Sequence, residues 1–183
     1  MTVLDLSNFA GLAAMILITL NVLLGILLSR NYNPARRWPF RKIPVFRIHN
    51  WTAYVALVLI LLHPALLLLM DKPKFALGDL LYPVSSPGQS LYNTLGALTL
   101  YVLLVVVITS YFRPQLGSRP WKKIHYAAYF AGATMFLHGT LIDPYLKGKE
   151  PDYFDGEKVL IEGCFLLIVA ASVWRVRQKK KLL

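Results

Sequence analysis

Apolar residues in this chain gather in five long runs instead of alternating with polar residues. The runs cover residues 9–29, 48–70, 91–112, 124–142 and 158–174. Each is close to the ~20 residues that an α-helix needs to cross the hydrocarbon layer of a bilayer. A segment in lipid must satisfy its backbone hydrogen bonds internally, so runs of this length without period-two alternation predict helices. We therefore predict an all-α membrane protein, a bundle of five transmembrane helices that forms a single domain over residues 1–183.

Composition agrees with this class, since 56% of the residues are hydrophobic and only 16% are charged. The first run is expected to be a retained anchor, not a removable signal peptide, because the residues before it include Asp5 and no Lys or Arg. The only cysteine, Cys164, lies in the fifth run. It leaves no partner for an intramolecular disulfide or a thiolate cluster, and we interpret it as a packing residue.

Charge is distributed unevenly between the two ends of the predicted bundle. Segments 30–47, 113–123 and 175–181 carry many basic residues and no Asp or Glu, whereas segments 71–90 and 143–157 carry most of the acidic ones. Basic residues in short loops stay cytoplasmic, so the N-terminus is expected outside and the C-terminus inside. Trp38, Trp121 and Trp174 fall near the same cytoplasmic edge, where interfacial anchors belong.

The formal net charge of +11 does not require a nucleic-acid partner. The cations line one membrane edge, where they face anionic lipid headgroups. We therefore expect the lipid membrane as a partner and no nucleic acid, in an integral membrane protein of a bacterial inner membrane.

All four histidines of the chain lie in apolar stretches and form two pairs. His49 and His63 are 14 positions apart, and His125 and His138 are 13 positions apart. At about 1.5 Å per residue, both separations are about 20 Å along a helix. If the two helices are antiparallel, one histidine of each pair lies near one membrane face and its partner near the other.

This arrangement predicts two bis-histidine haem b groups stacked across the bilayer. His49 and His125 would bind an inner haem, and His63 and His138 an outer one. Two imidazoles fill both axial positions of the iron and favour outer-sphere electron transfer. Ionisable groups within a bilayer are costly and usually functional, so four in matched positions favour metal ligation over isolated buried hydrogen-bonding histidines.

An ideal helix does not place the second pair as well as the first. At about 100° per residue, His63 lies within about 40° of the helix face that carries His49, but His138 lies about 140° away from that of His125. The second pair therefore requires a change in helical winding.

We expect a departure from ideal helix between Tyr126 and His138, with Gly132 and Gly139 as the positions that permit it. Gly132, and Gly96 in the third run, also suit the close approach of a flat macrocycle to the backbone. Simple helix packing explains these small residues equally well.

Two other function classes fit the same histidines. One is a quinol-linked cytochrome b, whose haems would be reduced by quinol without flavin. The other is a metal or proton transporter that uses the four side chains directly and would be colourless.

The segments FRIHNWTAYVALVLILLHP and RPWKKIHYAAYFAGATMFLHG resemble the ferric reductase-like transmembrane domain, with 13 and then 12 residues between the paired histidines. That superfamily includes NADPH oxidases, ferric reductases and the haem subunit of a bacterial methionine sulfoxide reductase system. The resemblance covers the second to fourth runs well and the outer two only by position. The shorter second gap favours this family over quinol-oxidising cytochromes b.

The resemblance implies an oxidoreductase subunit that passes electrons from a cytoplasmic donor through the two haems to an extracytoplasmic acceptor such as ferric iron, oxygen or a protein. These 183 residues contain no glycine-rich dinucleotide fingerprint. We therefore expect the donor to be a cytoplasmic flavoprotein reductase that supplies a flavin, a free reduced flavin, or membrane quinol. Basic residues expected near the propionates of the inner haem are Arg41, Lys42, Arg47, Lys122 and Lys123.

Overall fold

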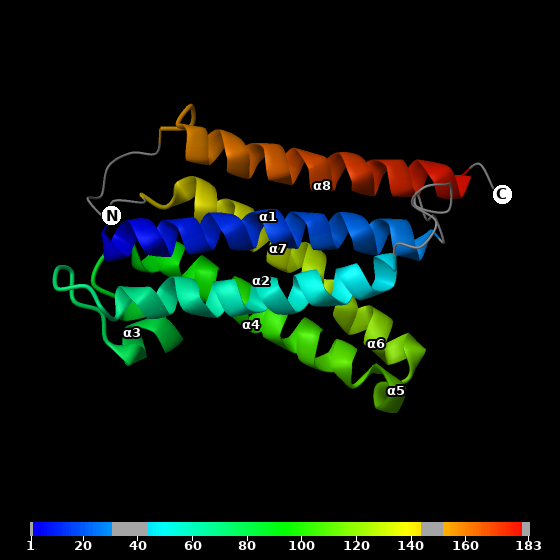
Figure 1. Cartoon of the computed structure of the whole chain (residues 1–183), viewed down its shortest axis with the longest axis horizontal. Helices are drawn as coiled ribbons and strands as arrows, with labels where there is room; N and C mark the ends of the chain where they lie inside the picture. The colour runs from blue at the N-terminus through cyan, green and yellow to red at the C-terminus, as the bar shows by residue number, and fades with distance from the viewer. Residues whose placement is uncertain (1, 31–43, 144–151, 181–183) are drawn as a thin grey trace.

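The computed structural model of the chain describes residues 2–30, 44–143 and 152–180, with side chains up to Arg177. All regular structure in these residues is helical. Four helices are long and apolar enough to cross a membrane, as expected for a membrane protein (Figure 1). They are α1 (Val3–Ser29), α2 (Val45–Leu67), α4 (Ser90–Tyr111) and α8 (Gly156–Lys180).

Helix α1 begins earlier than the expected residue 9 because its start is capped. The Thr2 hydroxyl accepts a hydrogen bond from the Asp5 amide at 3.1 Å, and the Asp5 carboxylate accepts one from the Thr2 amide at 2.7 Å. This reciprocal capping box satisfies amides that would otherwise lack partners. The expected span 48–70 is likewise shifted, since α2 begins directly after Pro44 and ends at Leu67.

The expected span 124–142 is divided into α6 (Ser118–His125) and α7 (Ala127–Leu141), with Tyr126 between them. Because α7 has only 15 residues, it is shorter than the ~20 of a full span, and a fifth single spanning helix is not confirmed. The predicted departure from ideal helix is found at Tyr126. Its attribution to Gly132 and Gly139 is wrong, since both lie inside continuous α7.

Backbone hydrogen bonds explain the break at Tyr126. The Tyr129 amide bonds to the Tyr126 carbonyl at 3.1 Å, an i→i+3 contact of the 3₁₀ type. Such a turn winds by about 120° per residue instead of about 100°. The tighter winding supplies part of the extra rotation that the 13-residue histidine spacing requires.

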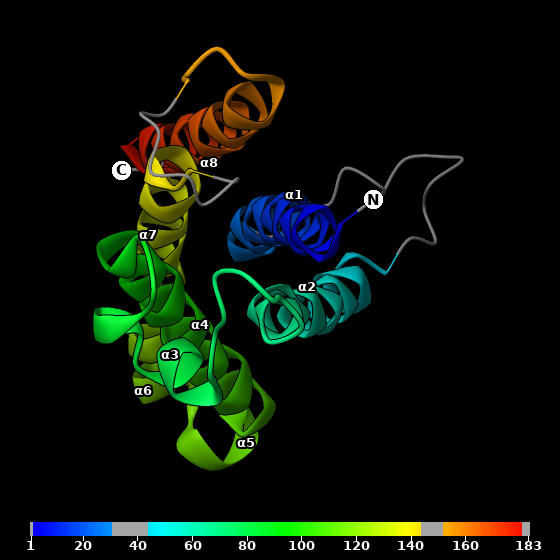
Figure 2. The ribbon, with the colours of Figure 1, turned by 90° about the vertical axis from the view of Figure 1, so that its left-hand side faces the viewer.

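Short helices connect the long ones at the two ends of the bundle. Helices α3 (Leu77–Leu81) and η2 (Pro83–Ser85) lie between α2 and α4, and α5 (Arg113–Leu116) lies between α4 and α6. Helix α1 packs on α2, α4 packs on α7, and α8 contacts both α1 and α7. In the end-on view of Figure 2 these pairs are separate layers, with α8 beside them.

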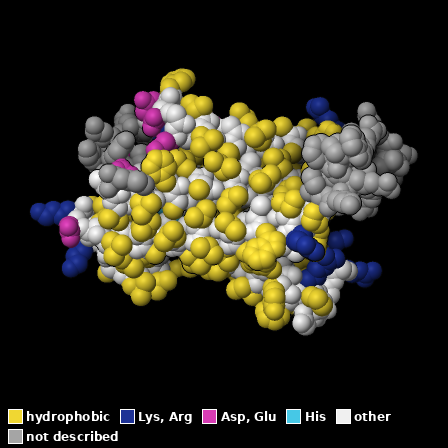
Figure 3. Space-filling view, in the orientation of Figure 1, with side chains coloured by type: hydrophobic (Ala, Val, Ile, Leu, Met, Phe, Trp, Pro, Cys, Tyr) yellow, Lys and Arg dark blue, Asp and Glu magenta, His cyan; other side chains and the backbone are white. Residues whose placement is uncertain are grey.

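The buried core lies where the two helix pairs and α8 meet. Cys164 belongs to this core, which confirms its interpretation as a packing residue. Outside it, apolar side chains cover the middle of the face shown in Figure 3, with Lys and Arg gathered at the α5–α6 end. The core cluster comprises Met15, Ile18, Ala56, Leu103, Ala131, Met135, Ile161 and Cys164.

Packing at Ala131 offers a test of this core. Ala131 is 0% exposed, whereas Ala133 on the same helix faces outward. We expect Ala131→Leu to destabilise the fold by about 1–3 kcal/mol, because extra methylenes in a close-packed core force neighbours out of place. Thermal unfolding in detergent measures the effect, with Ala133→Leu as the matched control. Equal stability of the two variants would contradict this core assignment.

Candidate functional site

The four histidines face one another in two pairs at opposite ends of the bundle. The ring centres of His49 and His125 are 6.3 Å apart with planes at 66°. Those of His63 and His138 are 6.2 Å apart with planes at 72°. The structure thus brings together the same histidines that the sequence pairs, His49 and His63 from α2 and their partners from α6 and α7.

These separations match the space that one metal between two imidazoles requires. A metal–nitrogen bond of about 2.0–2.1 Å, with about 1.1 Å from Nε2 to the ring centre, places two opposed imidazoles about 6.3 Å apart. Among the described residues, no three His, Cys, Asp or Glu side chains gather at one point. Each pair therefore offers two imidazoles, the number that a bis-histidine haem would take.

Three of the four imidazoles are held by a backbone carbonyl of the neighbouring helix. Nδ1 of His49 lies 3.0 Å from the Asn21 carbonyl oxygen. Nδ1 of His63 lies 2.7 Å from the Ser7 carbonyl oxygen, and Nδ1 of His138 lies 2.7 Å from that of Tyr92. A carbonyl can only accept, so in each ring Nδ1 carries the hydrogen. Nε2 keeps its lone pair for a metal, as in most metal-ligating histidines.

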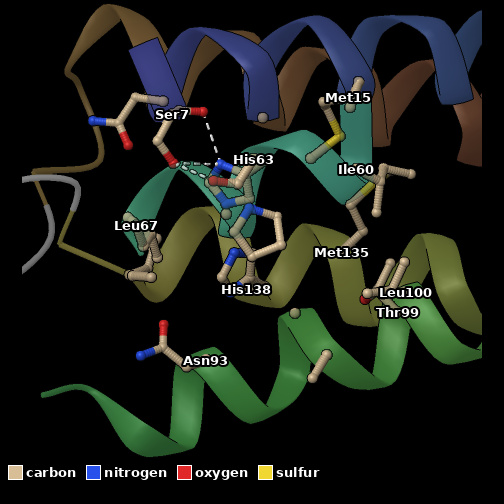
Figure 4. Close-up of a pocket in the computed structure, with 18 of the residues that line it drawn as sticks. Ser7, Met15, Ile60, His63, Leu67, Asn93, Thr99, Leu100, Met135 and His138 are labelled. Carbon is tan, nitrogen blue, oxygen red and sulfur yellow. Dashed lines mark hydrogen bonds between the residues drawn. The ribbon is translucent and has the colours of Figure 1, made fainter. Parts of the chain in front are cut away.

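Side chains on α1 strengthen two of these contacts. The fully buried Ser7 hydroxyl donates to the His63 carbonyl at 2.7 Å and lies 3.0 Å from His63 Nδ1. Figure 4 shows these bonds and, across the cavity, the facing ring of His138. The Asn21 amide donates to the His49 carbonyl and to the Thr52 hydroxyl. Both α2 histidines are therefore fixed in orientation from α1.

Glycines allow the same three rings to lie against the neighbouring backbone. A Cβ added to Gly11 would lie 3.1 Å from His63 Nδ1, and one added to Gly25 would lie 3.3 Å from His49 Cε1. At Gly96 the added Cβ would lie 2.9 Å from His138 Cε1, closer than real Cβ contacts permit. An imidazole thus occupies the space of a side chain at Gly96, and at Gly11 and Gly25 it leaves only tight room for one.

His125 is held differently. Its Nδ1 lies 3.3 Å from the Ser110 hydroxyl, which also accepts a hydrogen bond from Trp121 Nε1 at 3.2 Å. The Trp121 ring lies beside the imidazole at 4.9 Å between centres, and Arg113 lies over Trp121 at 4.3 Å.

Each histidine pair lines its own cavity. One, of about 180 Å³, contains His63 and His138, and the other, of about 630 Å³, contains His49 and His125. Ile60 lines both cavities. Members of the buried core lie on either side of Ile60. Those that line the His63–His138 cavity are Met15, Met135 and Ile161, and those that line the His49–His125 cavity are Ile18, Ala56 and Leu103. The two sites are therefore separated by a closely packed apolar layer.

The charges around the two cavities differ. Arg113, Lys122 and Arg175 line the His49–His125 cavity, and none of its described lining residues is Asp or Glu. Arg175 donates to the hydroxyls of Tyr129 and Tyr126 at 3.0 and 3.4 Å. The His63–His138 cavity contains the opposite balance, with Asp79, Asp143, Glu157 and Lys158.

Among the described residues that line the His63–His138 cavity, Lys158 is the one cation, and it is only 3% exposed. Its ammonium group donates to the carbonyls of Gly139 and Ile142 at 2.7 and 2.6 Å. These carbonyls belong to the last turn of the helix that carries His138, where cations stabilise the helix end.

A flat macrocycle fits these residues. The gaps between the paired rings suit a metal-centred plate, and the three rings whose Nδ1 is bound to a carbonyl keep Nε2 available for its metal. Of the two glycines proposed from the sequence, Gly96 lies against a histidine, whereas an added Cβ at Gly132 would meet nothing within 4 Å.

Among the basic residues expected near an inner haem, Lys122 lines the cavity and Arg47 and Lys123 do not. Arg41 and Lys42, like the expected anchor Trp38, lie outside the described residues. Sequence reasoning missed Arg175 and the contact residues on α1. The sequence did contain a signal for these residues on α1. Ser7 and Asn21 are 14 positions apart, as are Gly11 and Gly25, and this is the spacing of the two histidines on α2.

Comparison with known families agrees with a transmembrane fold. The family described as "Ferric reductase like transmembrane component" matches residues 10–136, more than half of the chain. The protein belongs to this ferric reductase-like transmembrane family and is an integral membrane protein. His49, His63 and His125 lie within the matched residues, and His138 lies just beyond them. No curated protein and no solved structure matches the chain.

Proposed function

We propose that the protein is a dihaem b transmembrane electron-transfer subunit. His49 and His125 would hold an inner haem, and His63 and His138 an outer one. When bound, the haems supply one-electron carriers at two levels of the membrane. The observation that carries the proposal is the pair of imidazole gaps of 6.3 and 6.2 Å. In three of the four rings, a carbonyl contact at Nδ1 leaves Nε2 free for a metal.

Family membership supports transmembrane electron transfer. We propose that it runs from a cytoplasmic donor to an extracytoplasmic acceptor. We propose that the α6–α7 unit crosses as the fifth span, with its break at Tyr126. The basic end, with α5 and α6, then faces the cytoplasm, and the start of α1 faces outward. A bacterial inner membrane would meet these requirements.

The chain's own residues would orient and insulate the two haems. Arg113, Lys122 and Arg175 are suited to bind carboxylates at the inner site, because they line its cavity without a described acidic counterpart. The apolar layer between the cavities would separate the two haems by closely packed hydrophobic side chains.

Replacement of single histidines tests the pairing. We expect each single replacement to lower the haem content from two per chain to one, because one haem would lose a histidine ligand. His63→Ala and His138→Ala should lose the outer haem, and His49→Ala and His125→Ala the inner one. A pyridine haemochrome assay on purified protein gives the ratio, and the retained haem reports folding.

Val58→Ala, at an exposed position of α2, is the control and should keep both haems. A colourless wild-type protein, even when haemin is supplied during expression, would refute the proposal and favour a transporter. Two retained haems in His63→Ala would refute the pairing.

The glycine contact at the outer site provides a second test. We expect Gly96→Ala to weaken outer haem binding by about 10- to 100-fold, the range for disturbing a residue that orients a metal ligand. Its Cβ would otherwise lie 2.9 Å from His138 Cε1. Haem titration followed by absorbance measures the loss. Gly163→Ala, where the added Cβ meets nothing within 4 Å, should bind as wild type.

The basic inner cavity predicts a flavin donor over a quinol. We expect stopped-flow reduction by reduced flavin mononucleotide to be faster than by quinol, and to slow as salt increases, because the flavin phosphate is attracted to the cations. Reduced riboflavin, which lacks the phosphate, is the control and should depend less on salt. Faster reduction by quinol would instead favour a quinol-linked cytochrome b.

A further inference from the structure

The four histidine contacts follow one repeated pattern with a single exception. On α1, an accepting carbonyl precedes a glycine by four residues at Ser7 and Gly11, and again at Asn21 and Gly25. On α4 the same pattern occurs once, with the carbonyl of Tyr92 and the glycine contact of Gly96, both against His138.

The pattern changes fourteen positions further along α4, in the segment that faces His125 of α6. Val106 stands at the carbonyl position, but Ser110 stands where the other three units have glycine. The Ser110 hydroxyl donates to the Val106 carbonyl at 2.6 Å. The Thr109 hydroxyl also donates to this carbonyl, at the longer distance of 3.2 Å. Ser110 is therefore the closer of two hydroxyl donors to the oxygen that the repeat would otherwise offer to the imidazole.

The Ser110 oxygen is a weak acceptor for His125. Its only hydrogen is used toward Val106, so it accepts from both Trp121 Nε1 at 3.2 Å and His125 Nδ1 at 3.3 Å. Sharing one oxygen between two donors lengthens both contacts. The carbonyl contacts of the other three histidines are 2.7–3.0 Å.

The strength of this bond affects the metal. A strong acceptor at Nδ1–H makes the imidazole a more basic ligand, which favours the oxidised iron, whereas a weak acceptor leaves it less basic and favours the reduced iron. Only an electron is gained in the reduction, because the Nδ1 proton stays on the imidazole in both states.

We propose that Ser110 and Trp121 are positioning residues that raise the reduction potential of the inner haem, by giving His125 a shared hydroxyl acceptor in place of a backbone carbonyl. This inference rests on the proposed dihaem function. A raised potential at the cytoplasmic end makes transfer from the donor more favourable, and the contact acts at the one histidine whose ring also lies against Trp121.

Spectroelectrochemical titration of the purified holoprotein tests the inference. The reduction transition that persists in His63→Ala, which lacks the outer haem, is assigned to the inner haem. We expect Ser110→Gly to move this step to lower potential, because His125 can then use the Val106 carbonyl, and to leave the outer step in place. Trp121→Phe keeps a ring but removes the competing N–H, so it should move the same step in the same direction.

Two variants serve as controls. Ser110→Thr keeps the hydroxyl and should retain the wild-type inner potential. Ser7→Ala removes a hydroxyl at the other site while the Ser7 carbonyl still binds His63, and should leave the inner step unchanged.

If Ser110→Gly loses the inner haem, Trp121→Phe decides. If Trp121→Phe binds two haems and the inner-haem reduction potential is unchanged or higher than in the wild type, this inference is overturned and the dihaem function still stands. A wild-type protein without haem would instead refute the proposed function.

Discussion

The site depends on hydrogen bonds between imidazole Nδ1 atoms and carbonyl groups of the neighbouring helix. A histidine in an apolar interior must satisfy both ring nitrogens, and a carbonyl at Nδ1 leaves only a lone pair at Nε2. These contacts also fix the helix register, because a shift of one residue moves a side chain by about 1.5 Å and rotates it by about 100°. Ser7 with His63 and Asn21 with His49 therefore set how α1 lies against α2.

A 14-residue period makes two such contacts compatible within one helix pair. Fourteen residues are nearly four full turns, so both contacts fall on nearly the same face of each antiparallel helix. On α4, the two contact positions Gly96 and Ser110 are also 14 residues apart. The histidines that they contact, His138 and His125, are only 13 residues apart. The break at Tyr126 contributes part of the difference between the two spacings, because its tighter turn adds rotation on the side that is one residue shorter.

Much of this architecture could be predicted from the sequence, since long apolar runs locate helices and the histidine spacing determines which pairs can meet. The limits of α1 required the capping role of Asp5, which looks like an ordinary polar residue before an apolar run. The break at Tyr126 depends on local hydrogen bonds, and glycine positions do not reveal it. Gly11, Gly25 and Arg175 gain their significance only from helices distant in sequence, so tertiary packing had to identify them.

The two cavities differ in their described charges, and the difference bears on the electron path that we propose. A negative charge entering a low-dielectric site is stabilised by nearby cations, and the cavity with His49 and His125 is lined by three. The described lining of the cavity with His63 and His138 includes one lysine, which donates to two carbonyl oxygens at the C-terminal end of α7. The described charges therefore favour the reduced state more strongly at the basic end. Passage onward to the other end then requires an acceptor of sufficiently high potential to make the whole transfer favourable.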